Sequence, residues 1–310
     1  MKLSDFKYPL PRNLIAKYPV SPRDRSRLMV LHRDTQEIEL KHFYEIVDYF
    51  EEGSCLVMNE TKVFPARLIG RKEKTNAKIE VFILRELSKE ENIWDVIVDP
   101  ARKVRIGNKI YFDDDRFYCE VIDNTTSRGR TVRFNTKDDF FKIINKIGKM
   151  PLPHYIKREP TEKDKETYQT VYAKNIGSVA APTAGLHFTK QLLKKIENKG
   201  VKLAYITLHV GLGTFRTVEV EDLTKHRMDS EFYEITPQTA EIINKCIAHK
   251  GKIIAVGTST TRALESSVTT DNFVKPIKGW TDKFIFPPYN FRIVNQLITN
   301  ATGNHTFQWH

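Results

Sequence analysis

The chain is organised around the stretch from Gly177 to Val218. The stretch opens with Gly177-Ser-Val-Ala-Ala-Pro-Thr-Ala-Gly-Leu-His-Phe-Thr189 and closes with Leu208-His-Val-Gly-Leu-Gly-Thr-Phe-Arg-Thr-Val218. Between these two loops of small residues, the pattern predicts one helix and one strand. Small residues let the backbone approach a ligand closely, and the first N–H groups of a helix attract anions. The stretch therefore indicates either the wall of a ligand pocket or two turns that need glycine.

Each of the two loops carries one histidine, His187 in the first and His209 in the second. Histidine titrates near neutral pH, so either side chain is a candidate general acid or base. A single histidine is more often structural than catalytic, and the presence of one in each loop shifts the balance toward a chemical role. His187 and His209 are therefore candidate catalytic residues, and a structural role is the alternative for each.

Two further segments downstream carry candidate chemical groups. Asp229 and Glu231 are two residues apart, so in a strand they share one face, where a carboxylate can hold a cation or remove a proton. The segment Val256-Gly-Thr-Ser-Thr-Thr-Arg-Ala-Leu-Glu265 has the order of a strand, a polar turn and a helix, which is typical of a ligand loop. The alternatives are a solvated strand edge for the first segment and simple helix capping by hydroxyl groups for the second.

The sequence lacks the usual phosphate-binding and metal-binding motifs. Gly211-Leu-Gly213 has no third glycine, no Walker A loop is present, and no cluster of ligands has metal spacing. Cys55, Cys119 and Cys246 are far apart, which predicts reduced thiols in a cytoplasmic protein. We therefore expect no metal ion and no prosthetic group.

Length and charge narrow the class of the protein. The 310 residues suffice for one large domain or two ordinary ones, and the 40% hydrophobic content supports a sizeable core. No apolar run reaches the roughly 18 residues that a membrane span needs, and the first residues do not resemble a signal peptide. The net charge of +11 and the pI near 9.4 favour a nucleic acid partner. Biased codon usage is the alternative source of that charge.

The strand and helix patterns predict an α/β protein with an inserted barrel. Short strands separated by turns run from about residue 66 to residue 134, which is typical of a small antiparallel β-barrel. Helix–strand alternation on both sides predicts a mixed-sheet α/β main domain. The expected division is 1–65 and 150–310 for the main, catalytic domain and 66–149 for the inserted barrel domain. Within the main domain we expect a buried strand at Leu28–Leu31 and a charged helix from Asp164 to Lys174.

Several blocks of this sequence match one known family. The blocks are Tyr18–Leu31 with its Pro22-Arg-Asp-Arg-Ser-Arg-Leu28, Asn59-Glu-Thr-Lys-Val-Phe-Pro-Ala-Arg-Leu68, Pro100-Ala-Arg-Lys103, Met150–Arg158, Tyr168-Gln-Thr-Val-Tyr-Ala173, Ala180-Ala-Pro-Thr-Ala-Gly-Leu-His-Phe-Thr189, Leu208-His-Val-Gly-Leu-Gly-Thr-Phe215, Val256-Gly-Thr-Ser-Thr-Thr-Arg262 and Phe286–Asn300. The chain resembles the S-adenosylmethionine:tRNA ribosyltransferase-isomerases of queuosine synthesis over essentially residues 1–300. Because several blocks are long and specific, coincidence does not explain the match.

The resemblance implies a reaction and its substrates. Enzymes of this family take S-adenosylmethionine as a co-substrate and act on 7-aminomethyl-7-deazaguanine at the wobble position of tRNAs with GUN anticodons. They transfer and isomerise the ribosyl moiety, so that epoxyqueuosine-tRNA forms and adenine and methionine leave. A tRNA substrate accounts for the basic composition, and family context suggests a monomer. A weaker alternative, an ordinary nucleotide-dependent enzyme, lacks its phosphate-binding motifs here.

The resemblance also suggests roles for single residues. The candidate catalytic residues are His187, His209, Asp229 and Glu231. The candidate S-adenosylmethionine-binding residues are Thr183, Gly185, Gly211, Gly213, Arg216, Thr258, Thr260 and Arg262. Among these, the two arginines are expected at the carboxylate of the donor or at an RNA phosphate, and the two threonines 258 and 260 at the ribose. Weaker candidates for tRNA contacts are Arg23, Arg25, Lys157 and Arg158.

The chain departs from the family pattern at two places. Family members usually carry histidine where this chain has Asp229, which alters a possible proton-transfer partner. After Leu297-Ile-Thr-Asn300 they continue with Phe-His-Leu-Pro, whereas residues 301–310 here do not match. From this we expect an altered, truncated C-terminus. The alternative to an active enzyme is therefore a catalytically impaired family member that only binds tRNA.

Overall fold

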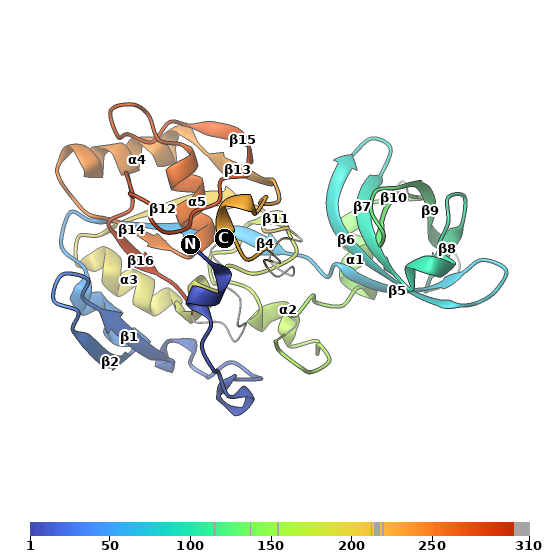
Figure 1. The fold of residues 1–310 in the computed structure, drawn as a ribbon, viewed down its shortest axis with the longest axis horizontal. Helices are drawn as coiled ribbons and strands as arrows, with labels where there is room; N and C mark the ends of the chain where they lie inside the picture. The colour runs from blue at the N-terminus through green and yellow to red at the C-terminus, as the bar shows by residue number, and fades with distance from the viewer. Residues whose placement is uncertain are drawn as a thin grey trace.

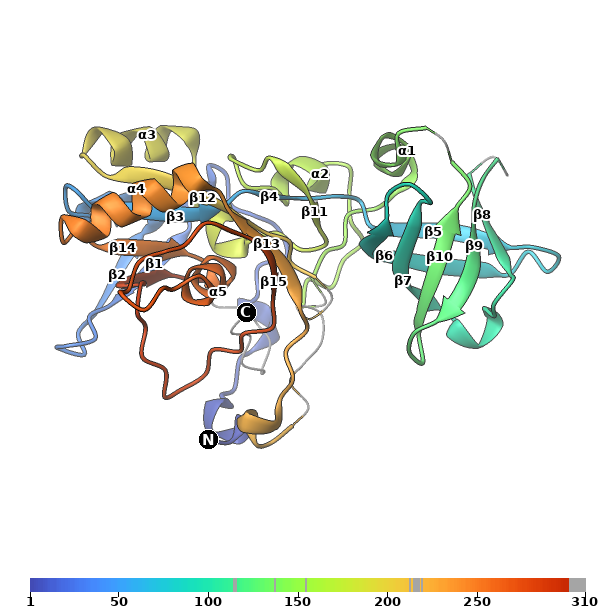
Figure 2. The ribbon, with the colours of Figure 1, turned by 90° about the horizontal axis from the view of Figure 1, so that it is seen from above.

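The chain folds into a layered α/β body and a separate β-barrel (Figure 1). The computed structural model describes residues 1–113, 116–136, 138–153, 155–211, 213, 218 and 220–300. Figures 1 and 2 show the barrel to one side of the main body, joined to it by two stretches of chain. The predicted α/β fold class with a small antiparallel barrel is confirmed.

A six-stranded mixed sheet forms the centre of the main body. In sheet order its strands are β15 (Ile277–Thr281), β13 (Glu231–Ile235), β12 (Lys202–Leu208), β3 (Cys55–Asn59), β14 (Ile253–Val256) and β16 (Gln296–Ile298). The four strands from β12 to β16 are parallel to one another, β13 pairs antiparallel with β12, and β15 pairs antiparallel with β13. Every residue of β3 is buried, as expected for a strand that is covered on both faces.

Successive residues of β3 face two different apolar layers. Leu56 and Met58 pack with the 3-10 helix η4 (Phe43–Tyr49) and with α3 (Lys190–Asn198). Cys55 and Val57 pack on the other face with α4 (Pro237–Ala248) and α5 (Thr258–Ser266). The side chains of Thr189 and Thr236 accept hydrogen bonds from the first turns of α3 and α4, as N-cap residues do. The sheet is therefore sandwiched between helices, and its strand ends remain as the place for a site.

The barrel closes on itself with six antiparallel strands. They are β5 (Arg67–Lys72), β6 (Lys78–Ser88), β7 (Ile93–Asp99), β8 (Lys109–Phe112), β9 (Phe117–Asn124) and β10 (Gly129–Phe134). Their order around the barrel is β10-β7-β6-β5-β8-β9. The helix α1 (Phe140–Ile147) packs against the barrel, where Phe140 stacks on the buried Trp94 with ring centroids 4.4 Å apart. These strands occupy the stretch from about residue 66 to residue 134 in which the sequence predicts short strands.

Two local predictions within the main body are right about the type of element but wrong about the burial of the first and the length of the second. The segment Leu28–Leu31 is part of β1 (Arg27–Leu31), but β1 pairs only with β2 (Ile38–His42), and alternate residues are exposed. The expected helix from Asp164 to Lys174 is reduced to α2 (Asp164–Thr167).

The reason for the short helix lies two residues after it. The amide of Gln169 accepts a hydrogen bond from Val63 N at 3.1 Å and donates one to Val63 O at 2.6 Å. Val63 belongs to β4 (Thr61–Val63), which pairs in parallel with β11 (Asn175–Ser178). Gln169 therefore satisfies both backbone groups of Val63, a geometry that a continuing helix would not reach.

A buried ion pair holds the loop that leads back from the barrel. Arg158 donates to the two carboxylate oxygens of Asp164 at 2.7 and 2.6 Å, and both side chains are almost fully buried. The guanidinium of Arg158 also lies over the ring of Tyr18, 4.5 Å from its centroid. This Arg158 hydrogen bond lowers the pKa of Asp164 to about 2. Arg158 therefore braces the fold, and the neighbouring Lys157 is the exposed cation of the loop.

Replacing Asp164 with Asn should make stability less dependent on acid pH. The folded pKa near 2 lies below the unfolded value near 4, so the carboxylate stabilises the fold above about pH 4 and loses this effect as pH falls through 2. We expect Asp164→Asn to lower the unfolding free energy by on the order of 2 kcal/mol at pH 7, and by progressively less between pH 4 and pH 2. Urea unfolding at each pH measures the difference.

The matched control is Glu162→Gln, whose side chain is 87% exposed and pairs with Lys165 at 2.8 Å. Exposed pairs contribute little, so this variant should differ from the parent chain by less than about 1 kcal/mol. Equal effects of the two substitutions would contradict a structural role for the Arg158–Asp164 pair.

Candidate active site

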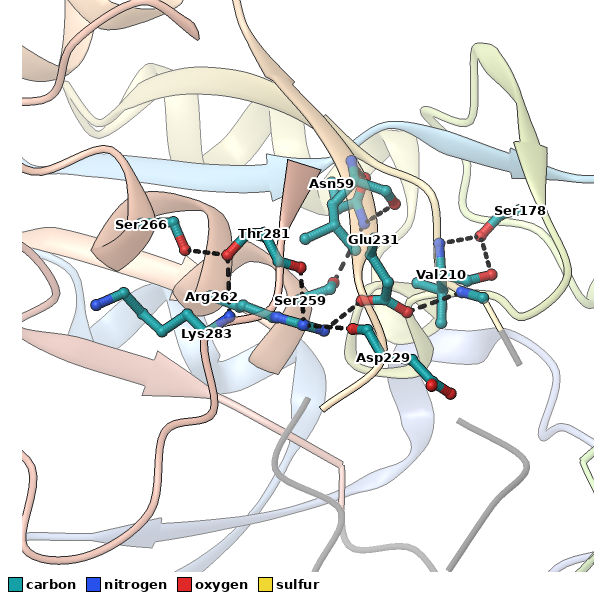
Figure 3. Close-up of polar contacts among 12 residues, drawn as sticks. Asn59, Ser178, Val210, Asp229, Glu231, Ser259, Arg262, Ser266, Thr281 and Lys283 are labelled. Atoms are coloured by element: carbon teal, nitrogen blue, oxygen red, sulfur yellow. Dashed lines mark hydrogen bonds and ion pairs between the residues drawn. The ribbon is translucent and has the colours of Figure 1, made fainter. Parts of the chain in front are cut away.

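The buried side chain of Asn59, at the end of β3, is hydrogen-bonded to the end of β12, the start of β4 and the first turn of α5. Its Oδ1 accepts hydrogen bonds from Leu208 N at 3.0 Å and Thr61 N at 3.1 Å. Its Nδ2 donates to Leu208 O at 2.9 Å and to Ser259 Oγ at 3.2 Å. Figure 3 shows Asn59 and Ser259 among the polar groups of this edge. Asn59 therefore fixes the carboxyl ends of β3 and β12 against the first turn of α5.

The loops that begin at Gly177 and His209 lie against each other. Ser178 Oγ donates to Ala180 O at 2.9 Å and accepts from Val210 N at 2.8 Å (Figure 3). A Cβ at Gly177 would lie 2.6 Å from His209 Nε2, so only glycine lets this ring approach the backbone so closely. The described starts of the two loops, residues 177–180 and 209–211, therefore lie together as one wall at the edge of the sheet.

His209 is held in this wall as a neutral side chain. Its Nδ1 lies 2.8 Å from Thr61 Oγ1, and its ring stacks on Phe232 with centroids 5.5 Å apart and planes at 23°. Burial penalises the imidazolium form and lowers the pKa of His209 to about 4. At neutral pH the ring is therefore uncharged and able to accept a proton.

His187 lies at a different point of the same sheet edge. It ends the 3-10 helix η6 (Thr183–His187), and its Nδ1 lies 2.8 Å from Ser26 Oγ. Its Nε2 lies 3.4 Å from Asn300 Oδ1, just beyond β16, and burial lowers its pKa. His209 follows β12 and Asn300 follows β16, and these two strands lie three positions apart in the sheet, so the two histidines occupy different positions of this edge. The fold brings them to one edge but not into contact.

A buried ion pair lies beneath the second loop. Arg262 Nη1 is 2.6 Å from Glu231 Oε2, and the side chains are 0% and 3% exposed. The other oxygen of Glu231 accepts from Gly211 N at 2.8 Å. Arg262 Nη2 also donates to Asp229 O at 2.8 Å and to Thr281 O at 3.0 Å (Figure 3). The pair therefore anchors the start of the Gly211 loop to β13, β15 and α5.

This pair changes the expected roles of its members. Burial raises the pKa of Glu231, and the charge of Arg262 opposes that rise. The guanidinium already holds a protein carboxylate and two carbonyl groups, which argues against its binding the carboxylate of a ligand. Asp229 contributes its backbone carbonyl to the pair, while its carboxylate points away from Arg262 in Figure 3 and lies beside Gly213. Asp229 and Glu231 thus do not act as one carboxylate pair.

The segment from β14 to α5 supplies one accessible hydroxyl. Thr258 is half-buried at the start of α5 and follows Gly257, whose φ of +87° suits glycine. Thr260 is fully buried and donates to Val256 O at 2.7 Å, so its hydroxyl is taken by the helix. Gly257 and Ala184 are neighbours, which brings η6 over the N-terminus of α5. Of the two threonines expected at the ribose, Thr258 is the one with a suitable position.

The remaining candidates of the first loop differ in environment. Gly185 is buried, and a side chain there would collide with the hydroxyl of Tyr172, so packing accounts for this glycine. Thr183 is half-buried at the start of η6. Arg216 lies outside the described residues.

Sequence reasoning missed three side chains that build the edge. Asn59, Thr61 and Ser178 carry the hydrogen bonds that place His209 and the two loops. The signal available in the sequence is the position of Asn59 and Thr61, which directly follow a continuous apolar strand. Polar residues at such a strand end point to the ligand edge of a parallel sheet.

Comparison with known proteins adds a family to this geometry. A sequence profile described as queuosine biosynthesis protein matches residues 3–304. The chain belongs to this family. It is 59% identical over 303 residues to the S-adenosylmethionine:tRNA ribosyltransferase-isomerase of Cytophaga hutchinsonii, with 97% of this chain and 87% of that protein covered. The corresponding protein of Chloroherpeton thalassium is 57% identical over 302 residues, with the same coverage. The resemblance drawn from the sequence motifs is confirmed.

A solved structure is also similar to this queuosine biosynthesis family member. The S-adenosylmethionine tRNA ribosyltransferase of Thermotoga maritima has 33% sequence identity and a TM-score of 0.48, and the match covers 96% of this chain and 84% of that one. Among the described residues of the family member, no three histidine, cysteine or carboxylate side chains are grouped as metal ligands. None of its described helices is long and apolar enough to cross a membrane.

Replacing Glu231 with Gln in this family member should strongly destabilise the fold. The substitution keeps the shape of the side chain but leaves Arg262 as an uncompensated buried charge. Breaking one partner of such a pair costs about 3–5 kcal/mol, which urea unfolding measures. The matched control is Glu241→Gln, because Glu241 pairs with Lys245 at 2.6 Å on an exposed helix surface and should contribute less than about 1 kcal/mol. Similar losses of unfolding free energy in both variants would contradict a structural role for the Glu231–Arg262 ion pair.

The pKa of His209 predicts how this family member responds to mild acid. Its folded pKa near 4 lies below the ordinary value near 6.5, so the unfolded chain binds more protons between these pH values. Stability should therefore rise as pH increases from about 4 to 6.5, and His209→Gln should flatten that rise. Denaturant unfolding across the window measures it, and NMR titration of the imidazole gives the pKa directly. A His209 ring that titrates near 6.5 would contradict this account.

Proposed function

We propose that this chain is an S-adenosylmethionine:tRNA ribosyltransferase-isomerase of queuosine synthesis. In the proposed reaction the ribosyl moiety of S-adenosylmethionine is transferred to 7-aminomethyl-7-deazaguanine at the tRNA wobble position and isomerised, and adenine and methionine are released. The observation that carries the proposal is the 59% identity, over 97% of this chain, to a relative with that name. The relatives favour this function over tRNA binding without catalysis.

The reaction places specific demands on proton transfer. The sulfonium of the donor acidifies the adjacent C5′–H, so a weak base suffices to remove that proton. Adenine leaves more readily when it receives a proton or a hydrogen bond, so a donor is needed at the other side of the ribose. The attacking aminomethyl nitrogen must be neutral. These demands require two separate groups and no prosthetic group.

We assign the base to His209 and the hydrogen donor to His187. His209 is neutral near pH 7 because burial lowers its pKa to about 4, which suits a weak base. An imidazole carries at least one N–H, and the His187 ring lies with Nδ1 2.8 Å from Ser26 Oγ and Nε2 3.4 Å from Asn300 Oδ1. The separate positions of the two rings along the edge agree with separate roles.

The binding surface for tRNA follows from charge and exposure. Of the four basic candidates, Arg25 and Lys157 are exposed. Arg23 donates to Gln169 O at 2.8 Å, and Arg158 is bound to Asp164, so these two are engaged within the protein. Lys157 also lines a cavity of about 370 Å³ beside Arg67 at the junction with the barrel. We propose Arg25 and Lys157 as contacts for RNA phosphates, and a monomer that acts in the cytoplasm on tRNAs with GUN anticodons.

One assay tests the proposed function against its alternative. The chain is incubated with S-adenosylmethionine and tRNA that contains 7-aminomethyl-7-deazaguanine, and free adenine is measured by chromatography. Adenine release that depends on the modified tRNA supports the transferase. Binding of that tRNA without adenine release favours a family member that only binds RNA.

Replacing either histidine should separate turnover from RNA binding. We expect His209→Gln and His187→Gln to reduce adenine release by about 100- to 10,000-fold, the usual contribution of a positioned acid or base, while the Kd for tRNA changes less than about twofold. The His209 variant should also lose exchange of the C5′ proton with deuterated solvent, which the His187 variant should retain. The control is His249→Gln, because His249 is exposed at the end of α4. Near-normal turnover in both site variants would refute the assignment.

A further inference from the structure

A row of three aromatic rings crosses the sheet from the candidate base to the surface. His209, Phe232 and Trp280 are lateral neighbours, because His209 N donates to Phe232 O at 2.9 Å and Phe232 pairs with Trp280 across β13 and β15. Ring centroids are 5.5 Å apart for His209 and Phe232, and 5.9 Å apart for Phe232 and Trp280. We call these three residues the aromatic row. Its inner end is the buried imidazole, and its outer end is an indole that is 54% exposed.

The outer end of the aromatic row meets the barrel. The guanidinium of Arg85, near the end of β6, lies 5.8 Å from the centroid of the Trp280 ring. Arg85 Nε donates to Asp95 Oδ2 at 2.8 Å, which holds the side chain in place. The terminal amino groups of Arg85 have no hydrogen bond to any described residue. The row therefore ends where β15 faces the barrel, as Figures 1 and 2 show for the two bodies.

The exposure of Trp280 is not explained by packing. Trp94, the other tryptophan of the described residues, is 2% exposed inside the barrel core, and large apolar rings are usually buried in this way. An exposed tryptophan beside a cation offers a flat π surface and a positive charge together. A nucleotide has the complementary parts, a flat base and an anionic phosphate, and base–aromatic stacking tolerates any base.

We propose that unpaired tRNA nucleotides next to the modified base stack on Trp280 and Phe232, with Arg85 at their backbone phosphate. This inference rests on the proposed function, because tRNA is its ligand. Proteins that recognise single-stranded RNA splay the bases apart and stack them on aromatic side chains. The wobble base must leave the anticodon stack to reach His209, and the aromatic row replaces the stacking that its neighbours lose. The row thereby directs the strand from the barrel junction to the candidate base.

Substitutions at the two outer residues separate stacking from charge. We expect Trp280→Ala to weaken binding of an unmodified tRNA transcript with a GUN anticodon by about 5- to 100-fold, as loss of one stacked base does. Trp280→Phe should restore most of that loss because it keeps an aromatic face. The salt dependence of binding should stay unchanged in Trp280→Ala, whereas Arg85→Ala should reduce the log–log salt slope by about 0.7. The KM for S-adenosylmethionine should not change in Trp280→Ala.

Intrinsic fluorescence gives a second, direct readout. Stacking of a base on Trp280 should quench the emission of the native chain when tRNA is added, and Trp280→Phe should lose that part of the quenching. The control is Leu40→Ala, which removes an 80% exposed apolar side chain on β2, away from the barrel. This control should bind tRNA like the native chain.

An interdomain latch without RNA contact is the competing explanation, and it predicts different results. In that case Trp280→Ala and Arg85→Ala would lower thermal stability by similar amounts and leave the tRNA Kd unchanged, which would overturn the proposal. Failure of the proposed function gives a different pattern. If the native chain releases no adenine but Trp280→Ala still weakens tRNA binding, the stacking site stands and the transferase does not. A native chain that binds no tRNA would overturn both.

Discussion

The arrangement of the site depends on a buried amide that must satisfy all its hydrogen-bonding groups. An unpaired polar group in this position would cost about 1–3 kcal/mol, so Asn59 can be tolerated only where partners are fixed around it. It finds them on β12, on the chain that leaves β3 and on the first turn of α5. These are the three places where a parallel sheet presents ligand-binding loops. Satisfying one amide therefore forces three loops into a single register.

The Glu231–Arg262 pair extends this constraint from the parallel strands to the antiparallel edge. A buried ion pair is weak evidence of net stability, because desolvation offsets most of the attraction. The ion pair here fixes the geometry of the loop. Each partner makes further hydrogen bonds: Glu231 accepts one from the amide of Gly211, and Arg262 donates to carbonyl groups before β13 and at the end of β15. The start of the loop that follows His209 is thus held by the Glu231–Arg262 pair and does not depend on a bound ligand.

Local sequence patterns predicted the layers of the fold better than they predicted the contacts within the site. Period and capping signals mark α3 and α4, because Thr189 and Thr236 act locally on their own helices. The length of α2 could not be foreseen, since Gln169 bonds to Val63, over a hundred residues away in the sequence. Long-range partners decided the site residues in the same way. Arg262 and Thr260 have the residue types of a ligand loop, but Nη1 of Arg262 is bound to Glu231 and the hydroxyl of Thr260 is bound to Val256 O. Whether a polar group is occupied or available depends on tertiary contacts that no local pattern contains.

Burial of His209 determines that its ring is neutral, and it leaves the positive charge of the aromatic row at the opposite end. The contact with Phe232 that removes the ring from water also lowers its pKa, so the inner end of the row is neutral at physiological pH. A charged imidazole there would attract phosphate toward the reacting atoms. With a neutral ring, the cation of the row is Arg85 at the open end, next to Trp280. In the proposed complex a nucleotide therefore enters with its backbone toward the barrel and its base toward the sheet. The same packing that keeps His209 neutral thereby orients the strand that carries the base to it.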